Sequence, residues 1–373
     1  MKKIKILNVG LSNNLGGIEK YLINIFRNID KSKFELDFLV YKGEKVCFYD
    51  EISKESNIYE LTRRTDNYYR YIKELGDFFK KSDYDYIHFH LMEFSCFERI
   101  ILAQKYTKAR IILHSHIANH KLPSFKTKVL NFVGKILVKK NDSYLKAACS
   151  MDAGRYMFSD FKDNNFVVLN NGIDIIEFKF NNDERIKMRK KLNLCGKFVI
   201  GNIGRFVTQK NHTFLLEIFK YVKEIKPNAS LLLIGSGKLK KRIIKKAQNL
   251  KVLDSIIFID KTNEVPSYLA VMDKFVFPSL FEGLGIVLIE AQASGLECYV
   301  TDSLPNEINI SNNITRISLK QDAQYWAKKI TQIEESIENR EKENERIKKE
   351  SNFDIKKSVN ILEKFYITNM ERK

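Results

Sequence analysis

The stretch 277–295, FPSLFEGLGIVLIEAQASG, carries the pattern on which the fold and function of this chain can be argued. It begins at the end of the apolar run 275–277, which predicts a buried strand, and continues into an apolar segment long enough for a helix. Two glutamates stand in it, Glu282 beside two glycines and Glu290 eight residues further on. A buried carboxylate without partners is costly, so we expect a partner for each of them.

Length and composition bound the class of protein. The chain has 373 residues, which is enough for two domains with their own cores. Its apolar fraction of 44% argues against disorder, and no run of about eighteen apolar residues predicts a membrane span. The N-terminus, MKKIKILNVG, predicts a first strand rather than a leader peptide, and the five scattered cysteines predict reduced thiols. We therefore expect a cytoplasmic protein.

The chain is strongly basic, with 64 Lys and Arg against 46 Asp and Glu, a net charge of +18. Such an excess attracts nucleic acid, anionic lipid or phosphorylated substrates, although a lysine-rich genome composition accounts for part of it equally well. The stretch 126–140, KTKVLNFVGKILVKK, has apolar residues at helical spacing, which is typical either of an interfacial helix or of a surface helix whose apolar stripe faces the core. Five lysines lie in it: Lys126, Lys128, Lys135, Lys139 and Lys140.

Strand and helix patterns alternate twice along the chain, from residue 4 onward and again from residue 197. Alternation of this kind predicts parallel sheets with crossover helices, so two series predict an α/β protein with two doubly wound, Rossmann-like domains. The polar segment 173–196 between the series reads as a linker region, and the charged tail 321–373 predicts helices.

Glycines and charged residues follow several of the predicted strands. In open parallel sheets, ligands bind beyond the carboxyl ends of the strands, where glycines let backbone N–H groups approach a phosphate. Arginine and lysine add direct charge pairing to a diphosphate. The residues that we expect at such a site are Gly16, Gly17, Gly204, Arg205, Lys210, Glu282, Gly283 and Gly285. Leu284 and Glu290, in the same segment, are added to them only by the family resemblance described below.

Metal-binding patterns are weak in this sequence. The D-x-D pair 83–85 precedes a predicted strand rather than following one, so we interpret it as solvated charge. Two H-x-H pairs, 88–90 and 114–116, place both members on one face of a strand, but no cysteine or acidic cluster accompanies them. We expect no metal site.

These segments resemble a known family. Glu282 and Glu290 form the E-x7-E pattern of GT4-type retaining glycosyltransferases of the GT-B fold, and residues 278–302 resemble the branch that builds bacterial capsular polysaccharides and exopolysaccharides. GRFVTQKN (204–211), NNGID (170–174) and LGGIEK (15–20) are similar to three further segments of that family. Asn170 and Gly285 stand where relatives often have proline.

The resemblance implies a fold and a division of labour between domains. Two Rossmann-like domains would face a central cleft, with an acceptor-binding domain over 1–175 and a nucleotide-sugar-binding domain over 176–352. A C-terminal helix, 353–373, would cross back to the first domain. It also implies that Glu290 binds the ribose, that Glu282 lies toward the sugar, and that Arg205 and Lys210 stabilise the leaving diphosphate without a metal or another cofactor. His114 matches the histidine near the reacting sugar, although His116, two residues on, is the alternative.

The leading hypothesis is thus a retaining, metal-independent hexosyltransferase that moves a sugar from a UDP-sugar to a lipid-linked or oligosaccharide acceptor. Its expected partners are the nucleotide-sugar, the acceptor and an anionic membrane surface at the inner face of the plasma membrane, with no nucleic acid. A UDP-sugar 2-epimerase of similar fold and a non-catalytic GT-B binding subunit are the alternatives.

Overall fold

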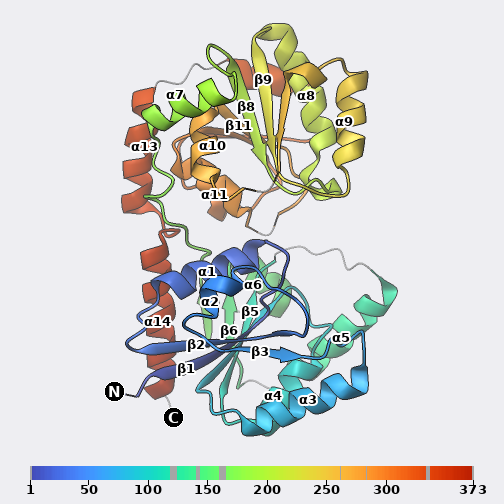
Figure 1. The fold of residues 1–373 in the computed structure, drawn as a ribbon, viewed down its shortest axis with the longest axis vertical. Coiled ribbons are helices and arrows are strands. Elements are labelled where there is room, and N and C mark those ends of the chain that lie inside the picture. The colour runs from blue at the N-terminus through green and yellow to red at the C-terminus, as the bar shows by residue number, and fades with distance from the viewer. Residues whose placement is uncertain are drawn as a thin grey trace. The chain divides into compact units, whose positions relative to one another are not determined.

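The computed structural model describes residues 2–117, 124–139, 143–158, 165–260, 262–282, 284–332 and 337–371. The chain divides into two compact units, shown in Figure 1. Unit 1 comprises Met1–Gly172 and Ile355–Lys373, and unit 2 comprises Ile173–Asp354. Each unit is built on a parallel sheet with alternating helices, which confirms the predicted α/β class.

The sheet of unit 1 has the order β3-β2-β1-β4-β5-β6-β7 in the described residues, with every pair parallel. Its strands are β1 (Ile4–Val9), β2 (Phe34–Tyr41), β3 (Ile58–Leu61), β4 (Tyr86–Leu91), β5 (Arg110–Ser115), β6 (Leu145–Ala148) and β7 (Phe166–Val168). Its helices are α1 (Gly17–Asn28), α2 (Tyr49–Ile52), α3 (Tyr68–Lys81), α4 (Glu98–Tyr106), α5 (Phe125–Lys139), α6 (Met151–Phe158) and α14 (Ile355–Glu371).

Helices cover both faces of this sheet, as its continuous apolar strands require. One face packs against α1 and α14 through a core that includes Phe26 and Tyr366. The other face packs against α3, α4, α5 and α6 through a core that includes Phe79 and Ile100. Helix α14, the last helix of the chain, lies against α1, the first (Figure 1). The C-terminal segment is therefore part of unit 1.

The sheet of unit 2 has the order β10-β9-β8-β11-β12-β13 in the described residues, again with parallel pairing. Its strands are β8 (Phe198–Ile203), β9 (Ala229–Ile234), β10 (Ile256–Ile259), β11 (Lys274–Phe277), β12 (Glu297–Thr301) and β13 (Ile314–Ile317). Its α-helices are α7 (Asn182–Lys191), α8 (His212–Ile225), α9 (Lys240–Asn249), α10 (Val265–Val271), α11 (Ile286–Ala293), α12 (Ala323–Thr331) and α13 (Ile337–Glu350).

Two cores hold unit 2 together, one on each face of its sheet. The first contains side chains of α7, α10, α11 and α13, and Leu288 is an example from α11. The second contains side chains of α8, α9 and α12, including Trp326, the single tryptophan of the chain. Large aliphatic and aromatic side chains fill both cores, and the burial of their apolar surface is the main favourable contribution to the stability of unit 2.

The segment 173–196 is not a linker, contrary to the interpretation of its polar composition. It folds as part of unit 2 and contains α7. Arg185 and Arg189 on α7 both pair with Asp273, and Arg189 Nη2 lies 2.7 Å from Asp273 Oδ2. The charged residues that suggested a linker thus anchor helix α7 to the rest of unit 2.

The strand order of each sheet reverses beside its first strand, between β1 and β4 in unit 1 and between β8 and β11 in unit 2. Such a topological switch point leaves a crevice outside the carboxyl ends of the strands, which is where open parallel sheets bind ligands. The loops that follow these strands are therefore the places to look for function.

Two expectations about the environment of the chain can be compared with the structure. The cysteines Cys47, Cys96, Cys149, Cys195 and Cys298 form no disulfide bond, as their scattered spacing predicts. Among the helices of the described ranges, none combines the length and the apolar character needed to cross a bilayer.

Candidate active site

Lys210 and Glu282 form a buried ion pair at the carboxyl edge of the unit 2 sheet. Lys210 ends a short 3-10 helix, Thr208–Lys210, that follows β8, and Glu282 lies in the loop after β11. Lys210 Nζ is 2.8 Å from Glu282 Oε1, and both residues are almost fully buried. Nζ also lies 4.4 Å from the centre of the Phe277 ring. The structure thus brings together two predicted site residues from two different loops at the switch point.

One side-chain and one backbone hydrogen bond hold these two loops side by side. Gln209 Nε2 donates to the carbonyl of Phe281 at 2.9 Å, and the amide of Leu280 donates to the carbonyl of Gln209 at 2.8 Å. Gly204 leaves room for the stem of Lys210, because a Cβ at Gly204 would lie 3.3 Å from Lys210 Cδ. Sequence reasoning assigned no role to Gln209, although it stands inside the segment GRFVTQKN.

The loop before α11 explains one departure from the family pattern. Gly285 has φ +71°, a left-handed conformation, immediately before α11. Proline holds φ near about −65° and cannot adopt it, so the glycine at this position reflects a different backbone path. Leu284 is buried in the core of unit 2, and Gly283 lies outside the described residues.

Arg205 and Glu290 differ in their exposure. Arg205, just after β8, is exposed and makes no ion pair with any described residue. Glu290 lies in the second turn of α11 and is only 3% exposed. A buried carboxylate and an exposed guanidinium therefore accompany the Lys210–Glu282 pair on elements that begin at the same sheet edge.

This arrangement suits an anionic ligand. Lys210 tolerates burial because Glu282 matches its charge, and the pair holds both side chains in place. Arginine forms bidentate, charge-assisted hydrogen bonds with phosphate oxygens, and the exposed Arg205 is available for such contacts. The unit 2 edge can therefore recognise a phosphate-containing group with one fixed and one adaptable cation.

The glycine-rich loop of unit 1 is held by a carboxylate that sequence reasoning missed. Gly16 caps α1, and its amide donates to Glu19 Oε2 at 3.0 Å. Ser12 Oγ donates to the other oxygen, Oε1, at 2.6 Å. Burial raises the pKa of Glu19, and these hydrogen bonds oppose that rise. The G-x-x-E spacing is a capping signal that could have revealed this contact. A donor-binding role of Gly16 and Gly17 stays a prediction.

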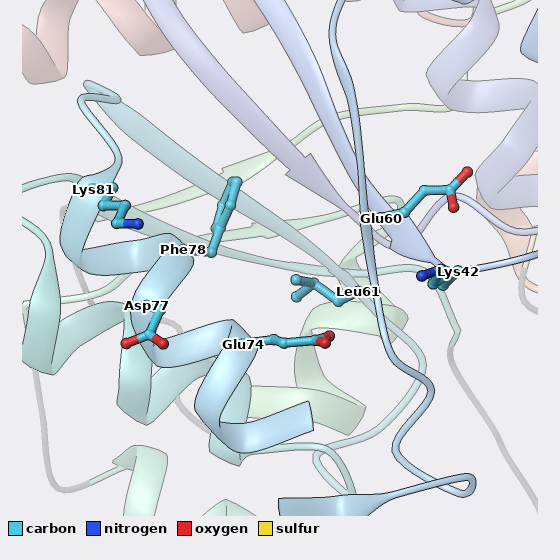
Figure 2. Close-up of a pocket in the computed structure, with 7 residues that line it drawn as sticks. All are labelled: Lys42, Glu60, Leu61, Glu74, Asp77, Phe78 and Lys81. Atoms are coloured by element: carbon cyan, nitrogen blue, oxygen red, sulfur yellow. The ribbon is translucent and has the colours of Figure 1, made fainter. Parts of the chain in front are cut away.

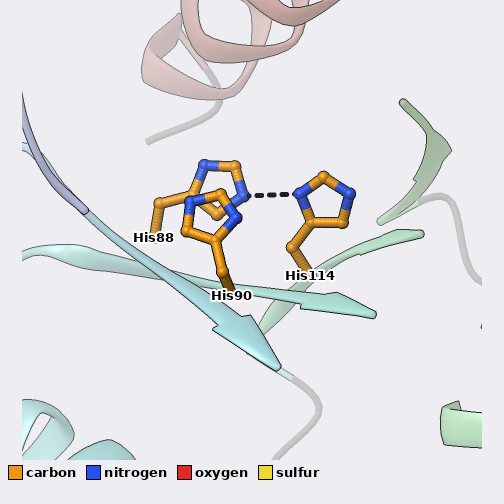
Figure 3. A group of neighbouring side chains, drawn as sticks. All are labelled: His88, His90 and His114. Atoms are coloured by element: carbon orange, nitrogen blue, oxygen red, sulfur yellow. Dashed lines mark hydrogen bonds between the residues drawn. The ribbon is translucent and has the colours of Figure 1, made fainter. Parts of the chain in front are cut away.

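Four histidines lie together at the carboxyl end of the unit 1 sheet. His88 and His90 come from β4, His114 from β5, and His116 directly follows β5. His88 Nε2 is 3.1 Å from His114 Nδ1, as Figure 3 shows, and His90 Nδ1 is 2.9 Å from His116 Nε2. The ring of Tyr21, from α1, meets the His114 ring edge-on, with 5.1 Å between their centres. The two H-x-H pairs thus form one cluster.

Burial keeps these imidazoles neutral. It lowers the pKa of His88 and His116 to about 3, and it lowers the pKa of His90 and His114 well below the ordinary value. His114 is fully buried and His116 is half-buried. The unit 1 edge therefore offers hydrogen-bonding groups without charge.

The same cluster is the best candidate for a metal site among the described residues, because one ring nitrogen of each of His88, His90 and His114 lies within 4.8 Å of the others (Figure 3). The nitrogens of His90 are already used, since Nε2 lies 3.2 Å from Asn8 Oδ1 and Nδ1 faces His116. Ligation by all three rings would break hydrogen bonds that they make to one another and to Asn8. We find no reason to replace the prediction of a metal-independent site.

Helix α5 presents an apolar face outward. Among its exposed residues are Phe125, at 82% exposure, and Phe132, at 66%, with Val129, Val133, Ile136 and Leu137 also exposed. Its inner side packs closely, because a Cβ at Gly134 would lie 2.2 Å from the carbonyl oxygen of Phe94. The interpretation in which the apolar stripe faces the core is therefore wrong for these residues.

The lysines of α5 differ among themselves. Lys126 and Lys128 are exposed, whereas Lys135 is half-buried, with Nζ 3.4 Å from the carbonyl oxygen of Tyr156. The side chain of Lys139 and the whole of Lys140 lie outside the described residues.

Two hollows are lined by residues other than the predicted site residues, although the second borders the loops that carry Lys210 and Glu282. One of about 490 Å³ lies between β3 and α3 in unit 1, and Figure 2 shows that charged side chains such as Glu60, Asp77 and Lys81 dominate it. The other, of about 100 Å³ in unit 2, is lined in part by His212, whose two ring nitrogens have no hydrogen-bond partner among the described residues. Neither contains a predicted site residue, so size alone does not mark the site.

Comparison with known proteins gives a consistent result. The family model described as "Glycosyl transferases group 1" matches residues 184–350. The putative glycosyltransferase EpsF of Bacillus subtilis is 31% identical over 344 residues, which cover 87% of this chain and 86% of that protein. A UDP-Gal:alpha-D-GlcNAc-diphosphoundecaprenol alpha-1,3-galactosyltransferase of Escherichia coli is 25% identical over 321 residues, covering 83% and 82%.

Solved structures support the fold. HepE of Anabaena, solved with UDP and glucose, is similar with a TM-score of 0.78 and 17% identity, covering 97% of this chain and 98% of that one. Sucrose-phosphate synthase from Thermosynechococcus elongatus is similar with a TM-score of 0.80 and 16% identity, covering 100% of both. At these identities the likeness shows the fold alone, and it confirms the predicted GT-B fold.

Proposed function

The chain belongs to the group 1 glycosyl transferases, and from this premise we propose that it transfers a hexose from a UDP-sugar to a lipid-linked glycan in bacterial surface polysaccharide biosynthesis, with retention of anomeric configuration. The observation that supports the donor class best is the Lys210–Glu282 ion pair at the switch point of unit 2. The names of the similar galactosyltransferase and of the HepE complex, which mention a diphosphoundecaprenol-linked sugar and UDP, point the same way.

In this proposal the main catalytic effect is electrostatic. As the bond between the sugar and the diphosphate breaks, negative charge grows on the leaving UDP, and Lys210 and Arg205 stabilise it without rearrangement. Glu282 keeps Lys210 in position through their ion pair, and it lies toward the sugar end of the donor. Glu290 accepts hydrogen bonds from the ribose hydroxyls, so that the two glutamates act at opposite ends of one ligand. No metal is needed, because the two cations supply the positive charge.

The first test is release and transfer of sugar by the purified protein. We expect turnover of one or a few UDP-sugars from a panel of nucleotide-sugars, with product of retained configuration by proton NMR and with no loss of rate in EDTA. Formation of a 2-epimeric UDP-sugar would support the epimerase instead, and tight UDP binding without turnover would support the binding subunit. Inhibition by EDTA would contradict metal independence.

A matched pair of variants tests the ion pair itself. Lys210→Met should lower kcat/KM by about 100-fold or more, as expected for one lost preorganised donor. Lys274 is the control, because it too is buried and paired, with Glu297 at 2.5 Å, but it stands at the start of β11, the opposite end of the strand. Lys274→Met should lower stability and leave kcat/KM nearly unchanged. Equal effects of the two variants on kcat/KM would contradict the assignment.

We also propose that α5 holds the protein at an anionic membrane surface, where a lipid-linked acceptor is presented. The exposed Phe125 and Phe132 can enter the headgroup region, and the exposed Lys126 and Lys128 can each contribute about 1 kcal/mol by attraction to anionic lipid. Net charge alone does not explain such an arrangement, because charge does not require exposed aromatic side chains.

Vesicle co-sedimentation separates the two contributions. Lys126→Glu with Lys128→Glu should weaken binding to anionic vesicles, and the wild-type protein should lose much of its binding in high salt. Phe125→Ser with Phe132→Ser should remove the part that resists salt. The controls are Lys241→Glu with Lys245→Glu on α9 and Tyr68→Ser with Tyr69→Ser on α3, which change exposed residues of the same kinds elsewhere. Equal loss in the controls would assign the binding to overall charge and hydrophobicity rather than to α5.

A further inference from the structure

A chain of buried polar groups connects the last helix to the histidine cluster. Tyr366 Oη, on α14, lies 2.8 Å from His88 Nδ1, and His88 Nε2 lies 3.1 Å from His114 Nδ1. His114 Nε2, the far end of this chain, has no hydrogen-bond partner among the described residues. The three residues are almost fully buried, so water cannot easily substitute for any of these contacts.

A second series of hydrogen bonds, Asn8–His90–His116, shows how the contacts determine which ring nitrogen carries a proton. Asn8 Nδ2 faces a backbone carbonyl, that of Asp37, at 3.5 Å, so Asn8 Oδ1 faces His90 Nε2. An amide oxygen only accepts, hence His90 Nε2 carries the proton, and neutral His90 accepts at Nδ1 from His116 Nε2–H. The Asn8 side-chain amide therefore fixes which nitrogen is protonated in both His90 and His116.

The Tyr366–His88–His114 chain can run in two directions. If Tyr366 donates to His88 and His88 donates to His114, the one unpaired group is the Nε2–H of His114. If His114 donates to His88 and His88 donates to Tyr366, both the Tyr366 hydroxyl hydrogen and the His114 Nε2 lone pair lack partners among the described residues. Since a buried unpaired donor is costly and the second direction adds an unpaired acceptor to it, the first direction is favoured.

The surroundings of the unpaired group favour the same direction. Tyr366 lies inside the core between α14 and the sheet, where a ligand cannot supply an acceptor for its hydroxyl. His114 lies at the carboxyl end of the sheet, next to the half-buried His116, with 4.0 Å between ring centres and the ring planes tilted by 32°. His114 is also fully buried, so its open donor is satisfied only by a ligand whose binding uncovers Nε2 at this edge.

We propose that Tyr366, acting through His88, holds His114 in the Nε2–H tautomer, so that His114 donates a hydrogen bond to a ligand oxygen and does not act there as a base. Tyr366 and His88 are positioning residues, and His114 is the residue that meets the ligand. The identification of that ligand as the sugar being transferred rests on the proposed function, whereas the tautomer itself does not.

Nitrogen NMR of protein labelled in its histidine rings tests the tautomer directly. We expect a protonated Nε2 and an unprotonated Nδ1 at His114. Tyr366→Phe removes one hydroxyl and keeps the ring, after which both directions leave one donor and one acceptor unpaired, so the His114 signals should move toward a mixture of tautomers. The control is Tyr86→Phe, because the Tyr86 hydroxyl donates to the backbone carbonyl of Tyr366 at 2.6 Å and takes no part in the chain. A protonated Nδ1 at His114, or equal effects of the two variants, would overturn the proposal.

Activity provides the second arm. His114→Leu should lower kcat by roughly 100-fold, as for loss of one preorganised donor. His114→Gln, whose amide can donate from nearly the same place, should recover part of that loss, which a lost base would not allow. No recovery would overturn the donor role. If the NMR result is as predicted but His114→Leu is fully active, the tautomer is right and the placement of the reacting sugar near His114 is wrong.

Discussion

The two sheet edges of this protein share a topology and differ in charge. In unit 2 the switch point carries Lys210, Glu282 and the exposed Arg205, whereas in unit 1 it carries neutral imidazoles linked by hydrogen bonds. The fold positions a site in the same place in both units, and the side chains alone decide what it can bind. A fixed lysine and an adaptable arginine suit a leaving diphosphate, and uncharged donors suit a sugar hydroxyl, to which they hydrogen-bond without attracting anions.

Lowering the pH should change the stability of unit 1 relative to unit 2 by more than any single substitution does. The pKa of each of the fully buried His88, His90 and His114 is lowered by burial, so below the ordinary value of 6.5 the unfolded chain binds protons that folded unit 1 cannot. The stability of unit 1 is therefore greatest above pH 6.5, and it is lost progressively as the pH falls below 6.5 toward the lowered pKa values of the folded state. At about pH 5.5 each should cost on the order of 1 kcal/mol of stability.

Trp326 allows the two units to be followed separately, because the only tryptophan lies in the core of unit 2. Between about pH 6.5 and 5, far-UV circular dichroism and urea titration should show loss of structure before Trp326 fluorescence changes. Most carboxylates titrate at lower pH, and among the described residues unit 2 has one comparable group, His212, whose pKa burial lowers to about 4, against the three fully buried histidines in unit 1. Simultaneous loss of both signals would mean that the neutral cluster does not set the acid sensitivity of unit 1.

The next effect in size concerns the coupling of Lys210 and Glu282. Lys210→Met and Glu282→Gln should each cost about 2–4 kcal/mol of transition-state stabilisation, because each removes a preorganised group or leaves its buried partner unpaired. The double variant should cost much less than the sum, since the two side chains act as one unit. Steady-state kinetics on all four proteins measures this, and additive effects would mean that the two groups act on the donor independently.

A smaller effect is expected at Glu290. Glu290→Gln keeps the shape of this buried side chain and weakens a charged hydrogen bond to ribose, so the donor KM should rise by about tenfold while kcat changes little. Kinetics with the UDP-sugar found in the donor screen would show this. A fall in kcat with unchanged KM would place Glu290, rather than Glu282, near the reacting sugar.

The fold could be predicted because alternation and apolar runs are local properties of the sequence. Strand β6 (Leu145–Ala148, LKAA) escaped prediction because it lacks the run of aromatic and β-branched residues that marks the equally short β11 (KFVF). The segment 173–196 was misread for a related reason, since its arginines find Asp273 only in three dimensions.

The sequence could name candidate site residues, but it could not show which of them are in contact. The motifs named Lys210 and Glu282, but a contact between residues 72 positions apart is not readable from either motif. The link from Tyr366 to His88 spans 278 positions and has no sequence signal. The outward face of α5 was also undecidable, because an apolar stripe at helical spacing fits a core as well as a membrane surface.

Isothermal titration of UDP against three proteins tests most directly whether the charged edge, and not the neutral one, binds the donor diphosphate. The wild type should bind UDP, Lys210→Met should bind it at least about tenfold more weakly, and His114→Leu should bind it as the wild type does, because UDP lacks the hexose that is transferred. Unchanged UDP binding in Lys210→Met together with lost binding in His114→Leu would contradict this division of roles between the two sheet edges.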